Sequence, residues 1–174
     1  VIVTAAPHQS GKDEYLMILM ILALDIEVCY LSAKWTMRRI PIPFIKPKDI
    51  DNQGIPWPLG WLQEIVFRKF GAIPVDRKGN SGQYDSVVQE LLKRDNFLLI
   101  ITPEGRFDAT RFRSSFLYLA KELEAEVMPV QIDYEHDTLK FLESLNLDGS
   151  EEEVIQRLRS CFDGVKGRKS RFKA

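Results

Sequence analysis

His8 and Asp13 stand five residues apart in the segment "PHQSGKD", which follows the apolar run "VIVTAA" at residues 1–6. A carboxylate that hydrogen-bonds one imidazole nitrogen fixes the tautomer and leaves the other nitrogen free to accept a proton. The pair therefore has the composition of a general base that activates a hydroxyl, a role typically worth about 10²–10⁴-fold in rate. Ser10 and Asp13 also fit a helix capping box, so Asp13 has a purely structural interpretation as well.

Further polar residues follow other apolar segments of the chain. Lys34 comes after "IEVCYLSA", Arg77 ends "GAIPVDR", and "ITPEGRF" carries Glu104, Gly105 and Arg106. Arginine binds phosphate through two parallel hydrogen bonds, and glycine permits close approach of the backbone. Arg77 and Arg106 are therefore candidates for an anion-binding site. Taken alone, Arg77 also fits a surface turn with a local ion pair, and "ITPEGRF" also fits an ordinary charged loop.

Apolar and amphipathic segments alternate along most of the chain, and the two kinds predict strands and helices respectively. We expect strands at residues 1–6, 26–33, 72–75, 96–102 and 126–132. We expect helices at residues 10–24, 59–71, 83–95, 114–125 and 151–162. The proline-rich stretch 37–58 shows no helical period and is expected to be extended.

This alternation predicts an α/β fold, with a mainly parallel or mixed central sheet flanked by helices on both faces. Ligand sites in such sheets collect at the carboxyl ends of the strands. The candidate residues follow four expected strands at these ends, so we expect them to share one crevice.

The composition limits the class of protein. The chain has 174 residues and a formal net charge of −1, which argues against a dedicated nucleic-acid-binding protein. Its length predicts a single domain over residues 1–174. Cys29 and Cys161 form no disulfide framework, which favours a reducing compartment. The longest apolar stretch, residues 15–24, is too short to span a bilayer.

Several common motifs are missing from the sequence. There is no G-x-S-x-G nucleophile elbow and no glycine-rich nucleotide-binding loop. His136 lies in the polar stretch "DYEHD", where solvent exposure is expected rather than metal binding. The tail from Gly164 to Ala174 has five basic and no acidic residues, which fits either a solvated chain end or contact with anionic lipid headgroups.

Taken in order, these motifs resemble the glycerolipid acyltransferase family that includes 1-acyl-sn-glycerol-3-phosphate acyltransferases. The resemblance covers about residues 1–132, and "PWPLGW" is similar to one small bacterial branch of the family. The four family blocks are similar, in order, to His8 with Asp13; to Gly71, Asp76 and Arg77; to "TPEGRF" at residues 102–107; and to "VMPVQI" around Pro129.

The resemblance implies an enzyme of phospholipid biosynthesis. It would move a fatty acyl group from acyl-CoA or acyl carrier protein to a hydroxyl of a glycerol-phosphate-type acceptor such as lysophosphatidate. His8 would be the general base, oriented by Asp13, with no metal and no further cofactor. Lys34, Arg77 and Arg106 would hold the acceptor phosphate, and Glu104 and Gly105 would shape the loop.

The resemblance also implies a cytoplasmic protein that contacts the inner face of a membrane peripherally. We expect this contact without the N-terminal membrane-associating helices that family members commonly use. The third block lacks the usual threonine, so Arg106 aligns only through a one-residue gap. Otherwise Phe107 takes that position, and Arg111 or Arg113 binds the phosphate. A non-catalytic lipid or acyl-carrier binding module and acyl transfer to a non-phosphate acceptor remain alternative interpretations.

Overall fold

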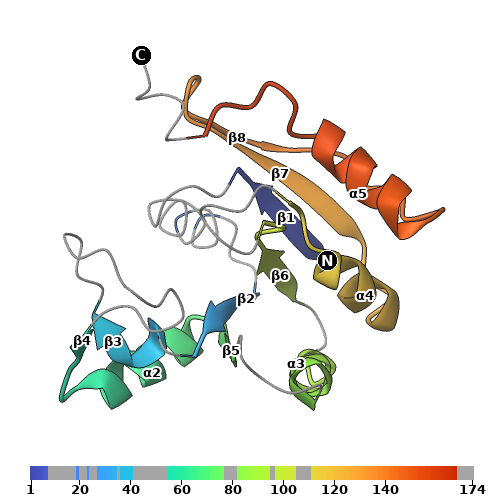
Figure 1. The fold of residues 1–174 in the computed structure, drawn as a ribbon. Coiled ribbons are helices and arrows are strands. Elements are labelled where there is room, and N and C mark those ends of the chain that lie inside the picture. Colours follow the sequence, from blue (N-terminus) through green and yellow to red (C-terminus); the bar gives the residue numbers. More distant parts are fainter. Residues whose placement is uncertain are drawn as a thin grey trace. The chain divides into compact units, whose positions relative to one another are not determined.

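A computed structural model describes residues 1–7, 19, 23, 27–34, 36–40, 55–76, 82–94, 97–104 and 111–167 (Figure 1). The chain divides into two compact units, one made of Val1–Glu27 with Leu98–Ala174 and the other of Val28–Phe97. Of the predicted helix at residues 10–24, the structure describes only Leu19 and Ala23, and both are helical. No helix within the described ranges is long and apolar enough to cross a membrane.

The first unit is built around strand β1 (Ile2–Ala6), all five residues of which are buried. The strand is parallel to β6 (Leu98–Ile101) on one side and to β7 (Val127–Asp133) on the other (Figure 1). A short antiparallel strand, β8 (Thr138–Phe141), pairs with β7. A strand buried on both faces reads as a continuous apolar run, which is why the sequence predicted β1 and β6 correctly.

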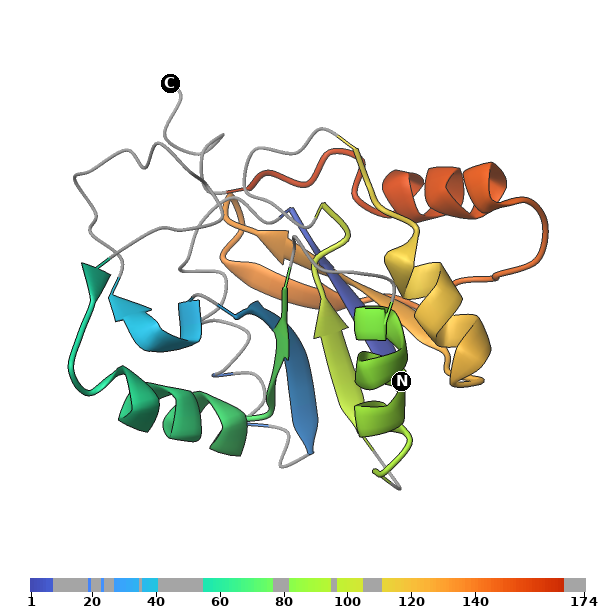
Figure 2. The same cartoon turned by 60° about the horizontal axis from the view of Figure 1, so that its bottom comes forward.

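Two helices of the first unit complete its core (Figure 2). The helix α4 (Ser115–Glu122) packs on β1 and buries Phe116 and Leu119, whereas α5 (Glu151–Ser160) buries Val154 and Leu158. The two helices are joined by a hydrogen bond of 2.8 Å from the Tyr118 hydroxyl to Glu151 Oε2. Apolar side chains spaced by three or four residues on each helix thus supply the buried stripe that the core requires.

Within its described residues, the second unit contains two pairs of strands and two α-helices. Strand β2 (Val28–Ala33) is parallel to β5 (Ala72–Val75), and β3 (Arg39–Ile40) is antiparallel to β4 (Ile55–Pro56). The turn η1 (Thr36–Arg38) packs against helix α2 (Gly60–Lys69), and α3 (Gly82–Leu91) contacts β5. Parallel pairs (β1 with β6 and β7, and β2 with β5) outnumber the antiparallel pair β7 with β8, so the sheet strands are mostly parallel and alternate with helices, which confirms the predicted α/β fold class.

The structure corrects three details of the sequence prediction. The stretch at residues 37–58 is not wholly extended, because η1 forms a helical turn at its start. Strand β8 was not predicted, since its residues are mostly exposed and lack an apolar pattern. Helix α3 ends at Leu91, four residues before the predicted helix end at residue 95, and Leu92 beyond it is exposed.

Candidate functional site

The carboxyl ends of β1 and β6 are neighbours in the first unit. Thr4 pairs with Ile101 in parallel register, so the chain leaves both strands at the same edge. His8 follows the last residue of β1 by two positions, and Glu104 follows the last residue of β6 by three. His8 and Asp13 lie outside the described residues, so the hydrogen bond between them stays a prediction.

Two described residues that follow β6 in the chain, Pro103 and Arg113, lie close together. Glu104 is 8% exposed, and the backbone N–H of Arg113 donates a hydrogen bond of 2.8 Å to the carbonyl oxygen of Pro103. The backbone of Arg113 therefore lies next to the start of the loop that carries Glu104, and the Arg113 side chain is exposed. Gly105 and Arg106 lie outside the described residues. The structure thus brings one of the two alternative arginines to the edge where β6 ends.

In the second unit the ends of β2 and β5 are neighbours in the same way. Ala33 pairs with Val75, and the backbone N–H of Lys34 donates to the carbonyl oxygen of Val75 at 2.8 Å. Lys34 and Asp76 are both exposed. Arg77 follows Asp76 directly and lies outside the described residues. The chain positions of Lys34 and Arg77 consequently follow adjacent strands at one edge.

Gly71 sets the start of β5 relative to β2. Its φ of 83° is in the left-handed region, and a Cβ at this position would lie 1.9 Å from the carbonyl oxygen of Val28. The Gly71 carbonyl oxygen accepts a hydrogen bond of 3.0 Å from the backbone N–H of Tyr30. Only glycine fits such a close approach of two backbones. The sequence predicted a helix end here, but not the contact with Val28, because that contact joins residues distant in the chain.

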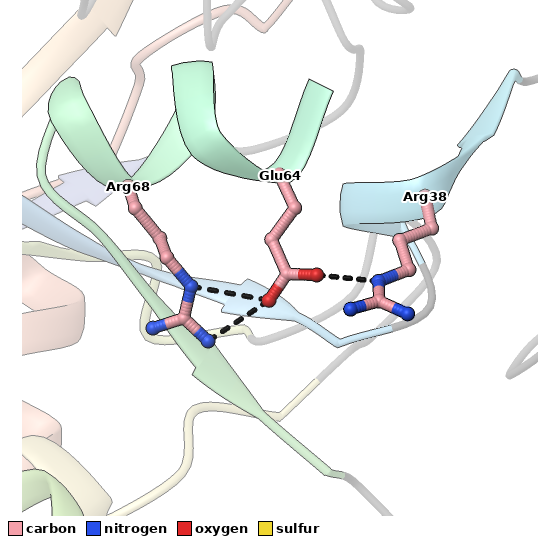
Figure 3. A network of polar contacts seen from close by, with 3 residues as sticks. All are labelled: Arg38, Glu64 and Arg68. Atoms are coloured by element: carbon pink, nitrogen blue, oxygen red, sulfur yellow. Dashed lines mark hydrogen bonds and ion pairs between the residues drawn. The ribbon is translucent and has the colours of Figure 1, made fainter. Parts of the chain in front are cut away.

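A charged network that the sequence did not predict joins α2 to η1 (Figure 3). Glu64 lies between two arginines: Arg68 Nη2 is 2.9 Å from Glu64 Oε1, and Arg38 Nε donates to Glu64 Oε2. The hydrogen bond from Arg38, followed by that from Arg68, lowers the pKa of Glu64 below its usual range. The four-residue spacing of Glu64 and Arg68 is a sequence signal for the ion pair within the helix. The contact with Arg38 has no such signal.

His136 is exposed, as the sequence predicted, and it interacts with Asp133 at the turn between β7 and β8. The distance from His136 Nδ1 to Asp133 Oδ2 is 2.8 Å, and this hydrogen bond raises the pKa of His136 and lowers that of Asp133. Cys29 and Cys161 are free thiols. Over the described ranges, no group of histidine, cysteine and acidic side chains is arranged to hold a metal ion.

Comparison with known proteins defines the class. Residues 58–133 match the family model described as Acyltransferase. The matched part contains Gly71, Asp76 and Arg77, the loop after β6, and Pro129, whereas His8, Asp13 and Lys34 precede it.

Residues 58–133 therefore match an acyltransferase-family domain, and this confirms the resemblance to the glycerolipid acyltransferases. A domain of this family implies an enzyme that transfers an acyl group from a donor to an acceptor. No curated protein and no solved structure matches the chain.

Proposed function

We propose that this protein transfers a fatty acyl group from acyl-CoA or acyl carrier protein to a hydroxyl of a glycerol-phosphate-type acceptor such as lysophosphatidate. The observation that carries the proposal is the acyltransferase match over residues 58–133, which spans the second, third and fourth family blocks in order. The parallel pairing of the strands also supports the proposal. The adjacent strands β1 and β6 precede His8 and Glu104, and the adjacent strands β2 and β5 precede Lys34 and Arg77.

The proposed chemistry is general-base catalysis by His8, oriented by Asp13. His8 removes the proton from the acceptor hydroxyl, and that oxygen attacks the thioester carbonyl of the donor. A new carbon–oxygen ester bond forms as the carbon–sulfur bond breaks. The departing thiolate then takes the proton that His8 holds, so the protein returns to its starting state. Backbone N–H groups would stabilise the negative charge that develops on the carbonyl oxygen.

Basic residues would hold the acceptor phosphate so that its hydroxyl points at His8. Lys34 and Arg77 are proposed for this role because β2 and β5 end side by side. After β6, the proposed ligand is Arg106. Arg113 is the alternative that the structure favours over Arg111, since its backbone bonds to Pro103. Glu104 would order this loop, and its burial supports an internal role over contact with a soluble ligand.

A lipid acceptor would place the protein at a membrane surface, and we propose peripheral contact with the inner, cytoplasmic face. The acceptor is amphipathic and is delivered from the bilayer, whereas both candidate donors are water-soluble carriers. A peripheral position would give the site access to both. No metal or further cofactor is part of the proposal.

A thiol-release assay with an acceptor panel tests the proposed function. The donors are acyl-CoA and acyl carrier protein, and the acceptors are lysophosphatidate, a lysophospholipid whose phosphate is blocked by a headgroup, and monoacylglycerol. Release that requires lysophosphatidate supports the proposal. Release only with monoacylglycerol would mean transfer to a non-phosphate acceptor, and no release with any acceptor would favour a non-catalytic binding module.

A further inference from the structure

Helix α2 exposes apolar side chains on the side that faces away from η1. Trp61 is 56% exposed, Leu62 43%, Ile65 44% and Val66 41%. Their spacing of one, three and four residues places them on one side of a helix. We call these four residues the α2 apolar face. Leu59 and Phe70, which flank the helix, are exposed as well.

The opposite side of α2 is polar, and it faces other residues of the same unit. Gln63 accepts a hydrogen bond of 2.9 Å from Trp57 Nε1 and donates one of 3.2 Å to the carbonyl oxygen of Arg39. Glu64 binds Arg38 on η1 (Figure 3). A helix on the surface of a globular protein normally buries its apolar side and exposes its polar side. In α2 this arrangement is reversed. An exposed apolar patch of this kind marks a surface that binds something outside the unit.

The charges around the α2 apolar face are positive. Arg68 and Lys69 are exposed in the last turn of α2. Glu64 is the one acidic residue of α2, and both of its carboxylate oxygens are bound by arginines. An apolar face with exposed cations around it and a neutralised acid complements a bilayer with anionic headgroups. Tryptophan is typical of the boundary between headgroups and acyl chains.

We propose that the α2 apolar face docks on the surface of an anionic lipid bilayer. Trp61, Leu62, Ile65 and Val66 enter the boundary between headgroups and acyl chains, and Arg68 and Lys69 bind lipid phosphates. All of these residues belong to the unit Val28–Phe97, so the surface is complete within one unit. The inference rests on the proposed function in one respect: docking on a bilayer would bring the enzyme to its acceptor, which under that proposal is a membrane lipid.

Vesicle flotation with the whole chain tests this surface without any acyl donor. One set of vesicles holds equal parts of phosphatidylcholine and phosphatidylglycerol, and the other holds phosphatidylcholine alone. We expect binding to the anionic vesicles and weaker binding to the neutral ones. The double substitution Trp61→Ser with Ile65→Ser should lower the partition coefficient about tenfold or more. Lys69→Gln should lower it about fivefold, the factor typical of one cation at an anionic surface.

Matched controls lie elsewhere in the same unit. Leu92 is 58% exposed and the Lys93 side chain 71%, so Leu92→Ser and Lys93→Gln remove an equally exposed side chain of each kind. Both should leave vesicle binding unchanged. Because all these residues are exposed, thermal unfolding should be nearly unaffected, and Lys69→Gln keeps the test valid if the double variant fails to fold.

Three results would overturn the proposal. The first is that the double variant binds anionic vesicles as tightly as the wild type. If neutralising Lys169, Arg171 and Lys173 then abolishes binding, the basic tail binds the vesicles in place of α2. The second is that the wild type binds neither set of vesicles. The third is a wild-type dimer that the double variant converts to a monomer without any vesicle binding, since a second copy would then cover the face. Vesicle binding without thiol release would contradict only the proposed function.

Discussion

The backbone N–H of Lys34 donates a 2.8 Å hydrogen bond to the carbonyl oxygen of Val75. This bond extends the parallel pairing of β2 and β5 by one step past Ala33. It therefore holds the backbone of the exposed Lys34 beside the end of β5, two residues before Arg77. Two basic residues far apart in the sequence thereby follow adjacent strand ends.

Removal of the Arg77 guanidinium should weaken acceptor binding more than turnover. We expect Arg77→Ala to raise the KM for lysophosphatidate about tenfold or more with a smaller change in kcat, because a charge-assisted hydrogen bond contributes about 1.5–3 kcal/mol. Lys34→Ala should act in the same direction but less strongly. Steady-state kinetics over a range of acceptor concentrations provides the measurement, with Lys93→Ala as an exposed control. An unchanged KM in Arg77→Ala would rule out its role as a phosphate ligand.

The close backbone contact at Gly71 predicts a large loss of stability on substitution. Gly71 and Gly164 both have a left-handed φ, of 83° and 77°, but only Gly71 of these two has a backbone atom in the space of a Cβ. Gly164→Ala should cost about 1–2 kcal/mol for the left-handed conformation alone. Gly71→Ala should cost that amount plus about 1–3 kcal/mol for the forced displacement of Val28. Urea unfolding compares the two, and equal losses would contradict the account of Gly71.

The interaction of His136 with Asp133 predicts a specific pH dependence. The raised pKa of His136 means that its contribution to stability is fully present below the unfolded value of about 6.5 and is lost as the pH rises through the folded pKa. The lowered pKa of Asp133 means that its contribution is present above about 3.9 and is lost as the pH falls through the folded pKa. The stabilising effect of the pair is therefore greatest between about pH 4 and pH 6.5.

Unfolding of the wild type and of His136→Ala at several pH values measures this effect. The difference between the two proteins should be small, because both groups are near the surface, and it should vanish well above neutral pH. An NMR titration of the two histidines provides the direct readout, since the pKa of His136 should lie above the ordinary value. A His136 pKa at or below the ordinary value would contradict the hydrogen bond with Asp133.

Local pattern and spacing predicted the strands and helices that build the sheet. β1 and β6 are apolar or nearly so throughout, and α4 and α5 have clear amphipathic periods, so each was predictable from its own residues. β8 was missed because an exposed edge strand needs little apolar content. The turn η1 was missed because it lies in a proline-rich stretch whose prolines favour extended backbone.

The positions of the candidate residues relative to the strands were predictable, but their contacts were not. Lys34, Glu104 and the residues before Arg77 follow the ends of paired parallel strands, where sites in such sheets are expected. Their role in one site stays a prediction. The return of Arg113 to Pro103 and the contact of Gly71 with Val28 were not predictable, because each depends on residues brought together only by the fold. The polar inner side of α2 was missed for the same reason.

The most direct test of acyl transfer by a histidine base compares substitutions of the two histidines of the chain, His8 and His136. Thiol release from acyl-CoA with lysophosphatidate is measured for the wild type, for His8→Ala and for His136→Ala, with thermal unfolding of all three as a check on folding. We predict that His8→Ala remains folded and releases thiol at the uncatalysed rate, and that His136→Ala retains wild-type activity. A folded His8→Ala protein that transfers the acyl group at the wild-type rate would contradict the account.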